Sequence, residues 1–423
     1  MKPKVPVFFE TNIIPTLVQY LSGRKPGKFT MICDDVEYRI LGKSVEDALL
    51  GEGHSINKVV LEGEHIAADA ASILKVLLYE TGHDTTYLAV GSGTVTDVTR
   101  FAAAVTRMPY LSLPTATSVD AYASGGSALT VERFKKHAET GRLPEAIFAD
   151  LKTLCEAPRR MIASGIGDTI AKFNAVADWK LANLVMDEVY NDEIAQRSLH
   201  AARECARISG DLENNYEENI RMMLEALIES GLCMVEMGNS LPASGTEHHF
   251  SHFWEMRMLI EDRPPALHGA KVGIGTIYAA RYWDKVRKIS AAQAAQLAAR
   301  TAAPTREAME QEIRSVYGPA SAQVLAIYRS WLEMDAAGYS AVKERIVKNW
   351  AGVQELAEGV PTPAEVAGWL KKVGGPTRPA EIDISERDTR DAIYYAHYIR
   401  RTFTIQKLCR LLGISLDVNP GLD

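Results

Sequence analysis

A chain of 423 residues is too long for one ordinary hydrophobic core, so we expect two or three domains. Hydrophobic residues make up 47% of the sequence and charged residues 24%, which is ordinary for a soluble globular protein. The formal net charge of −7 argues against nucleic-acid binding, which needs a basic surface. It still allows a locally positive pocket for a small anion.

The N-terminal residues and the cysteines favour a cytoplasmic protein. Glu10 interrupts the only apolar run near the start and no small-residue cleavage site follows, so we expect no secretory signal. No run approaches the roughly 18 consecutive apolar residues of a membrane span. The absence of C-x-x-C pairs favours reduced thiols over disulfides or a cysteine-bound zinc. The cysteines are Cys33, Cys155, Cys205, Cys233 and Cys409.

Strand and helix signals alternate along the first part of the chain. Because strands separated by helices pair in parallel with crossover helices, this order predicts an α/β, Rossmann-like domain. The predicted strands are 28–33, 57–61, 86–90, 110–113 and 146–149, and the predicted helices include 66–79 and 96–105. The charged tract 132–142 is expected to be a solvated excursion.

From Ala157-Pro158 onward the sequence is mostly helix-forming, with apolar residues at three- and four-residue spacing. Ser385 resembles a helix start. The clearest predicted helices are 194–208, 220–236, 291–303 and 364–373. We therefore expect an NAD-binding α/β domain at 1–157 and an all-α domain for metal and substrate at 158–423.

A glycine turn, Gly91-Ser92-Gly93, lies directly between a predicted strand and a predicted helix. Glycines let the backbone approach a pyrophosphate, and a helix N-terminus offers unpaired N–H groups with a positive dipole end. The turn lacks the full G-x-G-x-x-G pattern and follows a later strand than usual, so an ordinary tight turn is the alternative.

Two further strand ends carry polar side chains suited to a dinucleotide. The segment from Thr115 to Asp120 presents three hydroxyls and then a carboxylate, which suit a diphosphate, a ribose or a sugar-like hydroxyl. Asp34 ends the first predicted strand, where a carboxylate accepts from ribose hydroxyls and repels a 2′-phosphate, favouring NAD over NADP. The alternatives are a Ser/Thr-rich turn and a turn aspartate.

Four of the ten histidines lie between residues 248 and 268. On a helix, His248 and His252 share one face, and neutral imidazoles suit zinc, nickel or iron(II). Asp168, in a glycine-bracketed run, is the best candidate for an oxygen ligand. Glu247 and Glu255 are either partners that orient the imidazoles or exposed helix acids. The alternative for the whole cluster is a set of surface or core histidines without a metal.

Taken together, these segments resemble the sn-glycerol-1-phosphate dehydrogenase family of the dehydroquinate synthase-like and iron-alcohol-dehydrogenase-like superfamily, and its bacterial branch in particular. The matching segments are GSGTVTDVTRFAA, SLPTATSVDAYAS, FADLKTL, GIGDTIAKFNAVADWKLA, SGTEHHFSHFWEM and LHGAKVGIGT. They occur in family order, and the family's two-domain plan covers nearly the whole chain. Ser92 departs from the family's usual triple glycine, and Asp34 matches only loosely.

The resemblance implies a role for each matching position. It implies metal binding by Asp168, His248 and His268, with zinc or nickel as the metal. It implies catalytic and substrate contacts by Asp120 and His252, with Asp168 also at the substrate. Lys172, one turn after Asp168, is a candidate for the substrate phosphate, with a solvent-facing lysine as the alternative. The cofactor-binding residues implied are Asp34, Gly91, Ser92, Gly93, Thr94, Val95, Thr115, Thr117, Ser118 and Ser124.

The expected activity is the NAD(P)-dependent reversible reduction of dihydroxyacetone phosphate to sn-glycerol 1-phosphate. NAD is the expected cofactor, with NADP as an alternative, and the resemblance suggests a homodimer. Three competing functions are a dehydrogenase of an unphosphorylated polyol such as glycerol, a dehydroquinate synthase-like cyclase, and a nucleotide-sensing scaffold. The proton donor to the product is either His252 or a metal-bound water.

Overall fold

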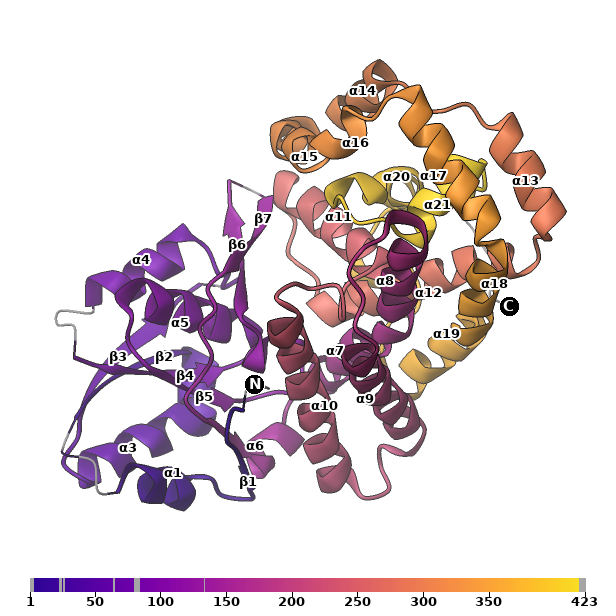
Figure 1. Cartoon of the computed structure of the whole chain (residues 1–423). Coiled ribbons are helices and arrows are strands. Elements are labelled where there is room, and N and C mark those ends of the chain that lie inside the picture. Colours follow the sequence, from indigo (N-terminus) through magenta and orange to yellow (C-terminus); the bar gives the residue numbers. More distant parts are fainter. Residues whose placement is uncertain are drawn as a thin grey trace. The chain divides into compact units, whose positions relative to one another are not determined.

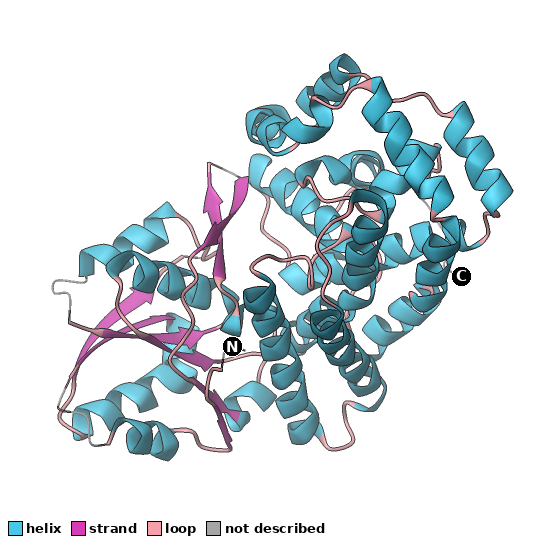
Figure 2. Cartoon of the chain, in the orientation of Figure 1, coloured by secondary structure: helices cyan, strands magenta, loops and turns pink. Residues whose placement is uncertain are grey.

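The computed structural model of the chain describes residues 4–22, 25, 27–63, 65–79, 84–132 and 134–417. It separates into two compact units (Figures 1 and 2). The first comprises Met1–Thr169 and Glu204–Gly238, and the second comprises Ile170–Arg203 and Asn239–Asp423. These units are defined by contacts alone, so the division into an NAD-binding domain at 1–157 and a metal-binding domain at 158–423 stays a prediction.

A six-stranded parallel sheet with the order β1-β8-β5-β4-β2-β3 forms the centre of the first unit. Its strands are β1 (Val7–Glu10), β2 (Lys28–Asp34), β3 (Ser55–Leu61), β4 (Thr86–Gly91), β5 (Tyr110–Pro114) and β8 (Ile147–Asp150). Five of these strands were predicted from the sequence. The edge strand β1 was not, because four residues next to a proline carry little periodicity.

Helices cover both faces of this sheet (Figure 1). In β4, Leu88 and Val90 pack with α1 and α3 on one face, while Tyr87 and Ala89 pack with α4 and α5 on the other. Both faces of each inner strand are therefore apolar, as expected for a parallel sheet. These helices are α1 (Ile14–Leu21), α3 (Lys43–Gly51), α4 (Ala70–Tyr79) and α5 (Gly93–Thr106).

A two-stranded antiparallel hairpin, β6 (Gly126–Val131) and β7 (Phe134–Glu139), was not predicted. It includes most of the charged tract that we expected to be a solvated excursion. Lys136 and Glu139 are exposed, as that expectation requires, but Phe134 is buried. Arg133 lies outside the described residues. Phe134 is the one buried residue of β7, so the strand has no alternating apolar pattern from which it could be predicted.

The remaining elements of the first unit connect the sheet to its helices. They are α2 (Asp35–Glu37), the π-helix η1 (Tyr38–Gly42), the 3-10 helix η2 (Asp120–Ala123), α6 (Leu151–Cys155), α7 (Arg159–Ile170) and α10 (Tyr216–Met237). Helix α7 packs closely on the loop after β5, since a Cβ at Gly165 would collide with the Thr117 carbonyl oxygen.

Among the described residues of the second unit there are helices and no strands, as predicted. Its helices up to residue 300 are α8 (Lys172–Met186), α9 (Asp192–Asp211, which runs on into the first unit), α11 (Thr246–Ile260), α12 (His268–Arg287) and α13 (Ala291–Arg300). The later ones are α14 (Arg306–Tyr317), η3 (Gly318–Ala320), α15 (Ser321–Ile327), α16 (Arg329–Leu332), α17 (Ala336–Lys348), α18 (Trp350–Gly359), α19 (Pro363–Lys372), η4 (Pro379–Ile382), α20 (Glu386–Tyr395), η5 (Ala396–Ile399) and α21 (Ile405–Leu412).

Two local features of these helices agree with the sequence. Ser385 caps α20, because its side chain accepts from the Asp388 backbone N–H. All five cysteines are free. Within the part of the chain that the structure describes, no helix combines the length and hydropathy that crossing a membrane requires.

Candidate functional site

The glycine turn connects β4 to α5 as the sequence predicted. Gly91 ends the strand, Ser92 is extended at φ −89° and ψ −157°, and Gly93 begins the helix. Side chains at either glycine would not fit: a Cβ at Gly93 would lie 2.8 Å from Val119 Cγ2, and one at Gly91 would collide with the Glu37 carboxyl group. The turn therefore keeps open backbone beside the positive end of a 14-residue helix, which suits an anion.

The two residues that follow this turn, Thr94 and Val95, differ from each other in burial. Val95 is buried in the core under α5, so its side chain packs and only its backbone is available to a ligand. Thr94 is half-buried at the first turn of the helix. Of the five residues from Gly91 to Val95 that we predicted to contact the cofactor diphosphate, Gly91, Ser92 and Gly93 form the turn itself.

A buried carboxylate that sequence reasoning missed faces the glycine turn. Glu37, which is 7% exposed, accepts from the Ser92 N–H at Oε1 (2.8 Å) and from the Thr115 hydroxyl at the same oxygen (3.3 Å). Burial and the neighbouring Asp34 carboxylate raise the pKa of Glu37 to about 7. A glutamate next to Asp34-Asp35 was the only sequence signal, and it looked like part of an acidic surface turn.

Asp34 ends β2 and forms a capping box with Glu37. Its Oδ1 accepts from the Glu37 N–H at 2.6 Å, and its own N–H donates to Glu37 Oε2 at 3.3 Å. In the structure Asp34 therefore stabilises the turn after β2, which was the alternative interpretation of this residue in the sequence analysis. A contact to cofactor ribose stays a prediction.

Hydroxyl groups of the loop after β5 and of neighbouring elements hold this segment in place. Thr117 Oγ1 lies 3.5 Å from Met223 Sδ, and the Ser118 carbonyl accepts from Ser164 Oγ of α7 at 3.1 Å. Ser124 Oγ donates to the Gly126 carbonyl at 3.1 Å. Thr115, Thr117, Ser118 and Ser124 are all buried, which fits residues that line a protected site better than a surface turn.

Asp120 and Asp168 lie side by side in the first unit. The Asp120 N–H donates to Asp168 Oδ2 at 3.1 Å, and Asp168 is completely buried. Asp120 Oδ2 accepts from the Ser230 hydroxyl of α10 at 2.8 Å. Ser230 is a contact that the sequence could not reveal, because 110 positions separate it from Asp120.

Three of the predicted histidines come together in the second unit. His248 and His252, one turn apart on α11, have ring centroids 6.0 Å apart. The His268 ring, at the first residue of α12, lies 5.3 Å from that of His248 and 5.9 Å from that of His252. His248 is buried and His268 half-buried. Asp168, the third predicted ligand, belongs to the first unit.

A buried network fixes the orientation of His248. Its Nδ1 donates to Glu247 Oε1 at 2.8 Å, which leaves Nε2 with a lone pair for a metal. Asn174 Nδ2 of α8 donates to Glu247 Oε2, and Trp283 Nε1 of α12 donates to Asn174 Oδ1 at 2.7 Å. Gly275 allows this arrangement, because a Cβ there would collide with the Glu247 backbone.

Asp178 extends the same network. It accepts from the Thr246 N–H at 2.7 Å and from the Ile405 N–H at 2.6 Å, and thus ties the start of α11 to the start of α21. Burial and the nearby Glu247 carboxylate raise the pKa of Asp178 to about 7. Because Glu247 is completely buried, the alternative that it is an exposed helix acid is wrong.

Two lysines of the second unit, Lys172 and Lys271, are buried. Lys172, the first residue of α8, is 0% exposed, so the alternative of a solvent-facing lysine is wrong. Lys271 Nζ donates to the Ala266 carbonyl at 2.9 Å and lies 3.6 Å from Glu255 Oε2. Glu255 is itself buried, so it is not an exposed acid either.

His249 is buried and His252 is half-buried, and the pKa of both imidazoles is lowered. Burial, and to a smaller extent the positive charge of Lys407, lowers the pKa of His249 well below its usual value. Burial, and to a smaller extent the positive charge of Arg400, likewise lowers the pKa of His252 well below its usual value. Both imidazoles are therefore neutral at pH 7, as metal or substrate contacts require.

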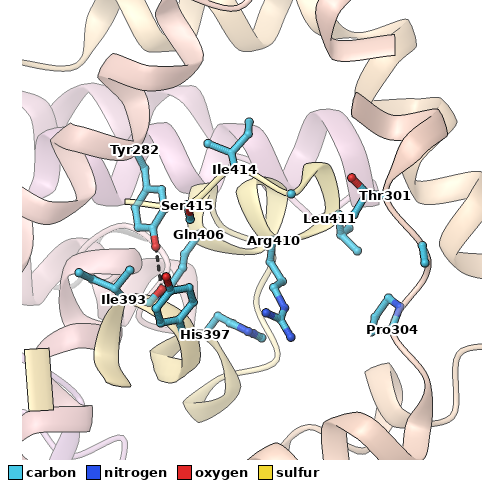
Figure 3. A pocket seen from close by; sticks show the side chains of 13 residues that line it. Tyr282, Thr301, Pro304, Ile393, His397, Gln406, Arg410, Leu411, Ile414 and Ser415 are labelled. Carbon is cyan, nitrogen blue, oxygen red and sulfur yellow. Dashed lines mark hydrogen bonds between the residues drawn. The ribbon is translucent and has the colours of Figure 1, made fainter. Parts of the chain in front are cut away.

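A cavity of about 310 Å³ lies elsewhere in the second unit (Figure 3). His397, Gln406 and Arg410 line it together with apolar side chains, and the Tyr282 hydroxyl donates to the Ile393 carbonyl at 2.7 Å beside it. No residue predicted for cofactor, metal or substrate lines this cavity, so it is separate from the site described above.

Comparison with known proteins identifies the fold. A family profile described as iron-containing alcohol dehydrogenase matches residues 8–158. The fold resembles that of glycerol dehydrogenase from Schizosaccharomyces pombe, with a TM-score of 0.61, 16% identity and coverage of 97% of this chain and 88% of that one. The predicted fold class is thus confirmed: the chain has the fold of the iron-containing alcohol dehydrogenases.

Closer relatives identify the family. The chain is 33% identical to glycerol-1-phosphate dehydrogenase (NAD(P)+) from Geobacillus stearothermophilus over 91% of its length and 86% of the relative. It is 34% identical to the protein of the same name from Bacillus subtilis, with the same coverage. The chain therefore belongs to the glycerol-1-phosphate dehydrogenase family. This confirms the resemblance, including its bacterial branch, and the predicted class of enzyme, an oxidoreductase.

Proposed function

We propose that this chain catalyses the NAD(P)-dependent, metal-dependent reversible reduction of dihydroxyacetone phosphate to sn-glycerol 1-phosphate. Its similarity to relatives named glycerol-1-phosphate dehydrogenase, at 33% identity over 91% of the chain, carries the proposal. The glycine turn before α5 and the cluster of three histidines on α11 and α12 are consistent with it.

We propose that the cofactor diphosphate binds at the Gly91–Val95 turn and the loop from Thr115 to Ser118, with Ser124 nearby. The small residues at the turn and the N-terminus of α5 support this assignment. Asp34 would contact the adenosine ribose, which favours NAD over NADP.

We propose that Asp168, His248 and His268 bind one divalent metal, zinc or nickel. The convergence of two imidazole rings at 5.3 Å supports it, as does the hydrogen bond that points His248 Nδ1 at Glu247 and leaves Nε2 for the metal. Two neutral imidazoles and one carboxylate suit either metal and leave a coordination position open.

When bound, the metal would supply Lewis-acid polarisation of the substrate C2 carbonyl, and NAD(P)H would supply hydride. The chain's own residues orient the reactants. Asp120, held by Ser230 and hydrogen-bonded through its N–H to Asp168, would accept from a substrate hydroxyl. His252 would contact the substrate and is a candidate for transfer of the proton to the product oxygen. Lys172 is a candidate for the substrate phosphate.

The decisive experiment measures NADH oxidation with dihydroxyacetone phosphate by the purified protein, first stripped of metal and then supplied with zinc or nickel. We expect activity only with metal, and a product that is sn-glycerol 1-phosphate. Equal turnover of unphosphorylated dihydroxyacetone would instead indicate a polyol dehydrogenase. Substrate turnover without net NADH consumption would indicate a cyclase. A protein that binds NADH but turns over no substrate would be a nucleotide-sensing scaffold.

We further propose a cytoplasmic location and a homodimer. The five free cysteines support the first, because reduced thiols suit the cytoplasm. Cell fractionation and light scattering of the purified protein test these two points.

A further inference from the structure

We propose that Glu37 competes with the cofactor diphosphate for the Ser92 amide and the Thr115 hydroxyl, so that cofactor binding requires a proton on the Glu37 carboxyl group. This inference rests on the proposed cofactor site and assigns a specific role to a residue outside the predicted set. All the residues on which it depends lie in the first unit.

The Glu37 carboxylate engages donors that the dinucleotide would need. Its Oε1 accepts from the Ser92 N–H at 2.8 Å and from Thr115 Oγ1 at 3.3 Å. Ser92 immediately precedes α5, so this carboxylate lies at the positive end of the helix, where the cofactor diphosphate is expected. Glu37 therefore connects the ends of β2, β4 and β5 as an anion would.

The carboxyl group has little room to withdraw. Glu37 is buried, its Oε2 accepts from the Asp34 N–H at 3.3 Å, and its backbone N–H donates to Asp34 Oδ1 at 2.6 Å. The carboxyl group also approaches Gly91 so closely that any side chain there would collide with it. Repulsion from an arriving diphosphate is therefore relieved most easily by neutralising the charge.

Protonation turns Glu37 from a competitor into a ligand. A neutral carboxyl group accepts more weakly than a carboxylate, so the Ser92 N–H and the Thr115 hydroxyl become available to the diphosphate. Its new O–H can in addition donate to a phosphate oxygen. The proton comes from the solvent, and no bond other than this O–H forms or breaks. Burial and Asp34 already raise the pKa of Glu37 to about 7, so neutralisation near neutral pH is inexpensive.

Lys58 of β3 lowers the pKa of the Cys33 thiol, but its ammonium group lies 3.7 Å from Glu46 Oε2. In the described part of the chain, the other titratable groups around Glu37 are acids. They are Asp34 and Asp35 on the same turn, Cys33 at the end of β2 and Tyr122 on η2. Strand β5 and helix α5 contribute Thr115 and Ser92, which do not titrate in this range. Burial raises the pKa of both the Cys33 thiol and the Tyr122 phenol, so neither group changes charge near pH 7.

The test measures the dissociation constant of NADH, by nicotinamide fluorescence, from about pH 6 to about pH 8.5 for wild type, Glu37→Gln and Asp35→Asn. We expect wild-type affinity to fall by up to about tenfold per pH unit above the pKa of Glu37. Glu37→Gln, which keeps the acceptor oxygen, should bind NADH more tightly at high pH and with little pH dependence. Asp35→Asn, which removes an exposed carboxylate of the same turn, should behave as wild type.

Calorimetry of NADH binding to the wild-type protein, in buffers of different ionisation enthalpy, gives the same answer without a variant. We expect uptake of close to one proton at about pH 8 and much less at about pH 6. Parallel pH profiles of wild type and Glu37→Gln, or binding without proton uptake, would overturn the inference alone. Failure of NADH to bind to any of these proteins would overturn the proposed function as well.

Discussion

The Trp283 indole N–H donates to Asn174 Oδ1 at 2.7 Å, and this hydrogen bond determines which way the Asn174 amide faces. With its oxygen occupied, Asn174 presents its Nδ2 group to Glu247, and Glu247 in turn accepts from His248 Nδ1. Glu247 thus sets the tautomer of a proposed metal ligand on α11, and a tryptophan on α12 helps to hold that carboxylate in place through Asn174. The chain of contacts is buried throughout, so none of its members can turn to water instead.

Replacing Asn174 by Ala should therefore weaken metal binding. Loss of the hydrogen-bond partner of a ligating histidine typically costs about 10–100-fold in affinity. Asn174 acts one contact further out, through Glu247, so we expect a loss near the lower end of that range, about tenfold. Zinc affinity, measured by competition with a chelator, tests this directly and needs no substrate. Asn183→Ala is the matched control, because Asn183 lies on the same helix but donates to the Glu188 carbonyl. Equal affinities for the two variants would contradict the orienting role.

Replacing Ser230 by Ala should lower catalytic efficiency while leaving the fold intact. The Ser230 hydroxyl donates to Asp120 Oδ2 at 2.8 Å, and a hydrogen bond to a charged group is worth about 1.5–3 kcal/mol. We expect kcat/KM for dihydroxyacetone phosphate to fall by about tenfold or more, with NADH affinity unchanged. Ser209→Ala provides a control, since that buried hydroxyl donates only to the Ala206 carbonyl. An unaltered kcat/KM would remove Asp120 from the proposed substrate contacts.

Replacing Arg100 by Ala should destabilise the first unit. The guanidinium is completely buried, donates to Asp97 Oδ1 at 2.9 Å and to the Gly126 carbonyl at 2.6 Å, and also contacts the Ala121 carbonyl. Removing one partner of a buried ion pair costs about 3–5 kcal/mol, because the other charge stays buried. Denaturant unfolding monitored by circular dichroism measures the loss. Arg160→Ala, at an exposed position, should change stability by less than about 0.5 kcal/mol.

The unfolding free energy should depend on pH through Glu37. An acid whose pKa is raised in the folded state binds more protons folded than unfolded, so its contribution to stability is complete below its ordinary pKa of 4.5 and is lost as the pH rises toward and through about 7. The difference corresponds to about 3 kcal/mol at most. Thermal unfolding of wild type and Glu37→Gln from about pH 5 to about pH 8 measures it. We expect the wild type to lose stability relative to the variant; a constant difference would contradict the raised pKa.

Local sequence patterns predicted most of the sheet and the helical half. Five of the six sheet strands are apolar runs that end at turn residues, and the glycine turn after β4 lies where the pattern indicated. The hairpin of β6 and β7 was missed because β7 is highly charged, and Phe134 is its one buried residue, so the strand carries no apolar pattern.

The site was predictable to the extent that its residues lie in recognisable motifs. The cluster of His248, His252 and His268 follows from helical spacing and from a conspicuous His-Gly pair. Glu37, Ser230 and Asn174 could not be found in this way, since each meets its partner across 55 to 110 positions of sequence. Such residues belong to no sequence motif, and their role can be recognised only from their contacts in the folded protein.

Strand β4 places Tyr87 and Ala89 in one core and Leu88 and Val90 in the other, and it ends at the glycine on which the proposed diphosphate turn depends. An inserted or deleted residue within it would exchange the two sets, bring the bulky tyrosine among the wrong neighbours and rotate the turn away from the sheet edge. We therefore expect this fold to tolerate changes in chain length only in the connections between its elements, because the length of β4 fixes the position of the turn.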